Sequence, residues 1–73
     1  MLVYVLRVEG RARLAQAFDH LMDDAEVVSC AIEPERSQLR FIAEAKTGDA
    51  LVDRIYQEGG LAWCSRHDFS TRD

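Results

Sequence analysis

The two cysteines and two histidines of this chain have the widest redox and metal chemistry among its side chains. Cys64 and His67 are three residues apart, so on a strand they point to opposite faces, and no second Cys or His pair accompanies them. The spacing therefore predicts no metal site. Cys30 and Cys64 fall in different strand-like runs, expected at opposite edges and on opposite faces of one sheet, beyond the ~7 Å reach of a disulfide.

Cys64 has Arg66 two residues away on the same face of a strand, and a nearby cation favours the thiolate form of a cysteine. The alternative, which we favour, is that Cys64 packs in an interface without reacting. Cys30 is interpreted as a small core residue, because free cysteines are among the most buried side chains. The sequence leaves open whether Cys64 is reactive.

An anion-binding segment is predicted where Glu9, Gly10, Arg11 and Arg13 lead into a helix. Free backbone N–H groups and the helix dipole favour a negative charge at a helix N-terminus. We therefore predict that these four residues bind a small carboxylate. The alternative is a turn whose two arginines are simply solvated.

Composition excludes several function classes. Nine basic and thirteen acidic residues give a formal charge of −4, which provides no general attraction to nucleic acid or to an anionic membrane. No apolar run approaches the ~20 residues of a membrane span, and no signal-peptide pattern is present, so we expect a cytoplasmic protein with reduced thiols. No nucleophile elbow, phosphate loop or Ser/His/Asp spacing occurs. We therefore expect no enzyme activity, no catalytic residues and no cofactor.

Periodicity predicts six elements. Strands are expected over residues 2–8, 26–33, 39–44 and 61–69, and an amphipathic helix over residues 11–23. A second helix is expected between the cap-type residues Thr47-Gly48-Asp49 and the stop Gly59-Gly60. Pro34 ends the second strand and begins a turn.

The order β-α-β-β-α-β predicts the fold class. We expect an α+β, ferredoxin-like βαββαβ sandwich, in which a four-stranded antiparallel sheet of order 4-1-3-2 carries both helices on one face. One domain over residues 1–69 and a polar C-terminal tail over residues 70–73 account for the whole chain. At 73 residues the core is modest, so self-association would add stability.

Period-two alternation assigns the two faces of this sheet. The predicted core, on the helix side, consists of Leu2, Tyr4, Leu6, Val8, Val28, Cys30, Ile32, Leu39, Phe41, Ala43, Leu61 and Trp63, packed against Leu14, Phe18, Leu21, Leu51 and Ile55. The opposite face is predicted to carry Val3, Val5, Arg7, Val27, Ser29, Ala31, Arg40, Ile42, Glu44, Ala62, Cys64 and Arg66.

Val3, Val5, Ile42 and Cys64 form an apolar stripe on that opposite face, which is normally polar when it is open to water. We predict that these four residues form an interface with a second copy or a partner protein. The alternative is that valine and isoleucine there only reflect strand propensity. No aromatic residue is predicted on this face, which argues against base stacking of the kind used by RNA-recognition modules of the same element order.

The chain resembles the ACT family of small regulatory domains. The similarity covers nearly the whole chain through element order and spacing, with residues 27–32 and 50–55 in the positions of the family's second strand and second helix. The family's first loop reads Asp-Arg-Pro-Gly followed by Leu, and here Arg11 and Leu14 match it while Arg13 stands in place of the Gly. The resemblance implies a βαββαβ domain that binds amino acids or similar ligands at a dimer interface.

Two functional hypotheses follow. The first is a non-catalytic regulatory module of ACT-like type that binds a small carboxylate such as an amino acid and acts through self-association or a partner enzyme. The second is an accessory, chaperone-like module that binds a partner protein by its sheet face or a strand edge, without a small ligand. Both predict a homodimer or a protein partner, and neither involves nucleic acid, a membrane or a metal.

Overall fold

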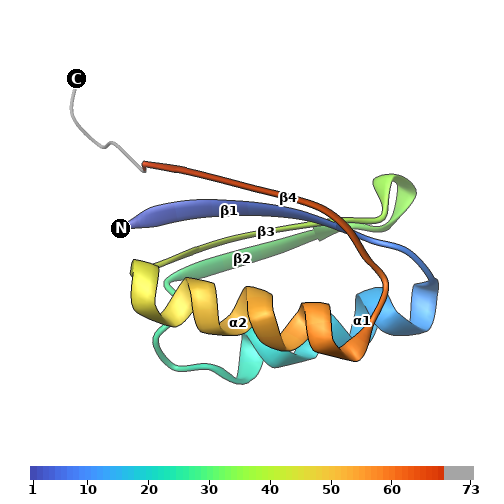
Figure 1. Cartoon of the computed structure of the whole chain (residues 1–73), viewed down its shortest axis with the longest axis horizontal. Coiled ribbons are helices and arrows are strands. Elements are labelled where there is room, and N and C mark those ends of the chain that lie inside the picture. The colour runs from blue at the N-terminus through green and yellow to red at the C-terminus, as the bar shows by residue number, and fades with distance from the viewer. Residues whose placement is uncertain (69–73) are drawn as a thin grey trace.

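One sheet and one layer of helices make up the fold of this computed structural model, which describes residues 1–68 (Figure 1). Phe69 and the predicted polar tail over residues 70–73 lie outside the described residues. The elements in chain order are β1 (Leu2–Val8), α1 (Arg11–Asp23), β2 (Ser29–Glu33), the 3-10 turn η1 (Pro34–Arg36), β3 (Gln38–Ala43), α2 (Ala45–Glu58) and β4 (Leu61–Asp68).

The sheet has the order β2-β3-β1-β4, and every neighbouring pair is antiparallel. This is the predicted order 4-1-3-2 taken from the other edge, so the predicted topology is confirmed. Both helices lie against the same face of the sheet (Figure 1). We call the opposite surface, which includes Val3, Val5, Arg7, Arg40, Ile42 and Trp63, the outer sheet face.

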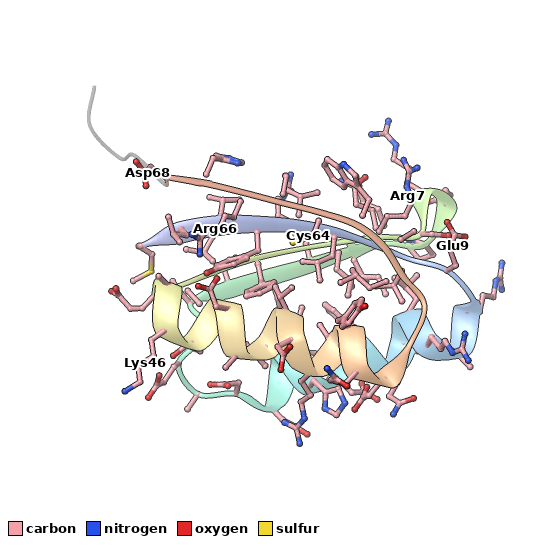
Figure 2. The ribbon with its side chains drawn as sticks, viewed as in Figure 1. Arg7, Glu9, Lys46, Cys64, Arg66 and Asp68 are labelled. Carbon is pink, nitrogen blue, oxygen red and sulfur yellow. The ribbon has the colours of Figure 1, made fainter. Side chains whose placement is uncertain are left out.

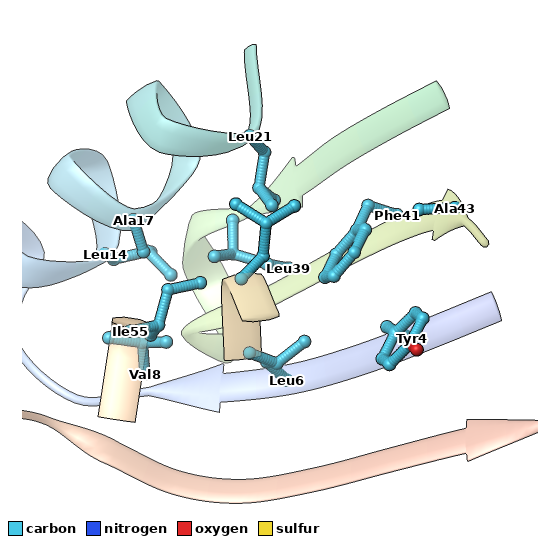
Figure 3. Packing of buried hydrophobic residues seen from close by; sticks show 11 residues of the cluster. Tyr4, Leu6, Val8, Leu14, Ala17, Leu21, Leu39, Phe41, Ala43 and Ile55 are labelled. Carbon is cyan, nitrogen blue, oxygen red and sulfur yellow. The ribbon is translucent and has the colours of Figure 1, made fainter. Parts of the chain in front are cut away.

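The core lies between the helices and the two central strands, β1 and β3 (Figure 3). Tyr4 and Leu6 are 1% and 0% exposed, which confirms the helix-side assignment of β1. Their neighbours come from both helices because the apolar residues of each helix recur at three- and four-residue steps. The buried cluster consists of Tyr4, Leu6, Val8, Leu14, Ala17, Leu21, Leu39, Phe41, Ala43, Leu51 and Ile55.

Tyr4 occupies a special position in this core because its ring passes close to the backbone of α2. The ring stacks on Phe41, with centroids 4.7 Å apart and planes 4° from parallel. The hydroxyl end of the ring lies against Gly48, where an added Cβ would come within 2.1 Å of it. Glycine at this helical position is therefore needed for steric reasons, although glycine normally weakens a helix.

The predicted faces of β4 are wrong from Trp63 onward. Val8 pairs with Leu61 but Arg7 pairs with Trp63, so Ala62 is an extra residue that forms a bulge. One extra residue reverses the alternation of every side chain after it. Cys64 therefore lies opposite Leu6 on the helix side, and Trp63 lies on the outer sheet face.

The same bulge moves Arg66, which pairs with Tyr4, to the helix side. Trp63, predicted in the core, is 51% exposed, so the prediction that the outer face has no aromatic residue is also wrong. Cys30 and Cys64 lie on opposite edge strands as predicted, but both face the helices rather than opposite sides. The structure has both as free thiols.

The start of β2 also differs from the prediction. The strand begins at Ser29 rather than at residue 26, and the residues before it do not follow its alternation. Val27 packs against the core, whereas Val28, predicted to be buried, is 64% exposed. Glu44, predicted to end the third strand, is the N-cap of α2, which begins at Ala45.

Candidate functional site

A groove lies between α2 and β4, on the helix side of the sheet. It forms because α2 packs mainly on β1, β3 and α1, which leaves the helix-facing side of the edge strand β4 partly uncovered. The groove has a volume of about 380 Å³, within the range of small-molecule sites. Its walls are formed by Tyr4, Asp49, Val52, Asp53, Tyr56, Leu61, Cys64 and Arg66.

One end of the groove is a network of three polar side chains. The Tyr4 hydroxyl donates to the Asp49 Oδ1 atom at 2.9 Å and lies 3.3 Å from the Ala45 carbonyl oxygen. Arg66 Nη1 donates to both carboxylate oxygens of Asp49, at 2.6 and 2.8 Å. Figure 2 shows Arg66 directed toward the helices, whereas Arg7 points away from them. The network joins β1, α2 and β4.

These contacts change the acidities of the three groups. The hydrogen bond from Arg66, followed by that from Tyr4, lowers the pKa of the Asp49 carboxyl. Burial, reinforced by the bond to Asp49, raises the pKa of the Tyr4 hydroxyl. The bond to Asp49 also raises the pKa of the Arg66 guanidinium. At neutral pH, Asp49 and Arg66 are therefore charged and Tyr4 is a neutral donor.

The other walls of the groove are mostly apolar. Val52 and Leu61 pack against the edge of the core, and Tyr56 is 62% exposed at the rim. Cys64, which is exposed, also lines the groove. Desolvation there, reinforced by the nearby Asp49 charge, raises the pKa of the Cys64 thiol despite the opposing effect of Arg66. These effects outweigh the activation that Arg66 alone would provide, so the structure favours the alternative in which Cys64 does not react.

The Asp49 network predicts a pH-dependent contribution to stability. A carboxyl whose pKa is lower in the folded chain stabilises the fold above its unfolded pKa, and this contribution is lost as the pH falls through the folded pKa. Asp49→Asn should therefore lower stability at neutral pH and have little effect in strong acid. Urea unfolding between about pH 7 and pH 2 measures the difference.

The control for this experiment is Asp53→Asn, which removes the same charge from the same helix outside the Tyr4–Asp49–Arg66 network. The effect at Asp49 should be small, because the Asp49 and Arg66 side chains are each about half exposed. A penalty for Asp49→Asn that stays constant down to strong acid would contradict this assignment.

The four residues predicted to bind a carboxylate surround the start of α1, and Glu9 also lines a hollow with Arg7 and Trp63. Gly10, with φ of 93°, is the N-cap of α1 and has no side-chain cap, while Arg11 is exposed. Arg13 packs over Gly59 and Gly60 at the end of α2. The Glu9 backbone N–H donates to the Gly60 carbonyl oxygen at 2.8 Å. Their role in binding stays a prediction.

The residues predicted to form an interface are divided between the two faces. Val3, Val5 and Ile42 lie on the outer sheet face, where Val3 pairs with Ile42 and Val5 with Arg40. Cys64 is on the helix side, so its predicted place beside Val5 and Ile42 is wrong. Whether the other three contact a partner stays a prediction.

Sequence patterns did not identify the groove. Asp49 was interpreted as a cap residue and Arg66 as a rim residue of the other face, while Tyr4 was assigned only to the core. Asp49, Asp53 and Tyr56 do share a helical face at steps of four and three residues, which is a usable signal. No sequence pattern marks the bulge at Ala62 that brings Arg66 to them.

Within residues 1–68, no group of three or more His, Cys, Asp or Glu side chains is arranged to hold a metal ion. None of the helices in this part of the chain combines the length and apolar character needed to cross a membrane.

Comparison of the chain with protein-family models, curated proteins and solved structures finds no match.

Proposed function

We propose that this protein is a non-catalytic, ferredoxin-like binding module of ACT-like type, which takes up a small amphipathic carboxylate in the groove between α2 and β4. The observation that carries the proposal is the pairing of an arginine at one end of the groove with apolar walls along it. The ligand class is an amino acid with an apolar side chain.

Arg66, at the polar end of the groove, has more N–H donors than its bonds to Asp49 use. A guanidinium carries five N–H groups, and Arg66 uses Nη1 for Asp49. Its Nε and Nη2 groups are the fork that binds a carboxylate through two parallel hydrogen bonds. Because Arg66 is about half exposed, a ligand reaches it without opening the fold.

The remaining walls match the other parts of an amino acid. Asp53 lies one helical turn beyond Asp49 and contributes a second carboxylate to the groove, which suits a ligand ammonium group. Val52 and Leu61 provide apolar surface for the ligand's side chain. A zwitterion with an apolar side chain therefore finds a partner for each of its three groups.

Titration of the protein with the apolar L-amino acids, followed by NMR or calorimetry, tests the proposal. Arg66→Gln should weaken binding by about tenfold or more, since a hydrogen bond between charged groups contributes about 1.5–3 kcal/mol. Arg40→Gln is the matched control, because it removes an arginine from the outer sheet face.

A second variant distinguishes the two ligand positions. Arg11→Ala should leave binding unchanged if the ligand lies in the groove. If Arg11→Ala abolishes binding and Arg66→Gln does not, the ligand lies at the α1 N-terminus instead. If no amino acid binds, the small-ligand proposal fails and the accessory, protein-binding function takes its place.

A further inference from the structure

The outer sheet face carries more apolar surface than a solvated sheet face needs. Val5 and Ile42 lie half-buried in its middle beside the buried Val3, and Trp63 is 51% exposed at its edge. Trp63 borders a shallow hollow of about 440 Å³, which is also lined by Val5, Arg7 and Gln38. An exposed tryptophan beside an apolar patch is typical of a surface that a partner covers.

The charges of the molecule are divided unequally between its two layers. Residues 11–28 and 44–58, which contain both helices, hold four basic and eight acidic residues and so account for the whole net charge of −4. On the outer side, Arg7 and Arg40 are balanced by Glu9, which lines the hollow, and by Glu33, which is in register with Gln38. This balanced face neither attracts a polyanion nor repels a second copy of itself.

We propose that two copies of the chain associate through their outer sheet faces in a two-fold interface, with Val5 and Ile42 near its centre and Trp63 toward its edge. Two sheets packed face to face lie about 10 Å apart and interdigitate their inner side chains. This arrangement places the two acidic helix layers on opposite outer sides of the dimer. It also gives the arginines of one copy the glutamates of the other as partners.

The size of the face limits the strength of this dimer. Four strands about 4.8 Å apart, with about 3.3 Å per residue, give a flat area of roughly 400 Å² before side-chain relief is added. Stable interfaces bury about 800 Å² per partner. We therefore expect a dissociation constant in the micromolar range, set largely by Trp63.

Trp63 is the single tryptophan of the chain, so its fluorescence reports directly on this surface. With increasing protein concentration, its emission should shift to the blue as the mass measured by analytical ultracentrifugation doubles. Val5→Asp should weaken association by about tenfold or more, because it buries an unpaired charge. Met22→Asp is the control, since Met22 is 62% exposed on α1 and lies away from this face.

Three other results would contradict the proposed dimer. A chain that stays monomeric up to about millimolar concentration has no such interface. A dimer that survives Val5→Asp uses another surface, such as the edge of β4. Salt-dependent quenching of Trp63 by a single-stranded oligonucleotide, without dimerisation, assigns the face to nucleic acid. Arg66→Gln should still dimerise, so this test is independent of the ligand proposal, and circular dichroism verifies that each variant folds.

Discussion

Replacing Gly48 with alanine should destabilise the protein, although the same change in most helices is stabilising. An alanine inside a helix normally gains about 0.5–1 kcal/mol over glycine. Here the new methyl group would come within 2.1 Å of the Tyr4 ring, which the stacked Phe41 prevents from moving away. Overpacking of this kind costs about 1–3 kcal/mol, and urea unfolding measures it.

Two comparisons make the Gly48 experiment decisive. Ala50→Gly, on an exposed position of the same helix, should cost only the usual propensity difference. Tyr4→Leu removes the ring atoms that the new methyl group meets, so the double variant Tyr4→Leu/Gly48→Ala should be less destabilised than the sum of the single changes. Strict additivity would contradict the proposed clash.

The largest loss of stability should follow Phe41→Ala. Phe41 is 1% exposed and stacks on its cross-strand neighbour Tyr4, so its removal leaves a cavity beside that ring. Such changes cost about 3–5 kcal/mol. Because a chain of this length has a total stability of roughly 4–11 kcal/mol, this change should remove at least about a quarter of it.

The matched control for Phe41 is Tyr56→Ala, which removes an aromatic ring that is 62% exposed. Its cost should stay within about 0.5 kcal/mol. Thermal and urea unfolding, followed by circular dichroism, provide both values. Equal losses for the two variants would contradict the assignment of Phe41 to the structural core.

The element order, the strand order and most of the core follow from the sequence because they depend on patterns that persist over many residues. β1 and β3 keep strict alternation, and α1 repeats its apolar residues at helical steps, so the core residues Leu6, Leu21 and Phe41 are predictable. The first and last residues of the strands and helices are less predictable. Val28 has the residue type of a strand but lies just before β2 starts, where its side chain does not follow the alternation of the strand.

The groove was not predictable, because it depends on single-residue geometry. Arg66 joins Asp49 and Tyr4 only because Ala62 is bulged out of the ladder, and an alanine carries no turn or bulge signal. Similarly, the sequence places only Arg66 beside Cys64, whereas the structure adds the partial desolvation and the Asp49 charge that raise the pKa of its thiol. The alternation of side chains along a strand predicts which sheet face a residue occupies only where no bulge shifts the strand register.

The bulge at Ala62 also has a consequence for how this surface varies. Because β4 is an edge strand, deleting or inserting one residue near its start exchanges the side chains of groove and outer face without touching the buried cluster. Related chains that differ by one residue here would present Trp63 to the groove and Cys64 to the opposite surface. A one-residue insertion or deletion would thus exchange the side chains of the groove and of the outer sheet face, while the fold stays the same.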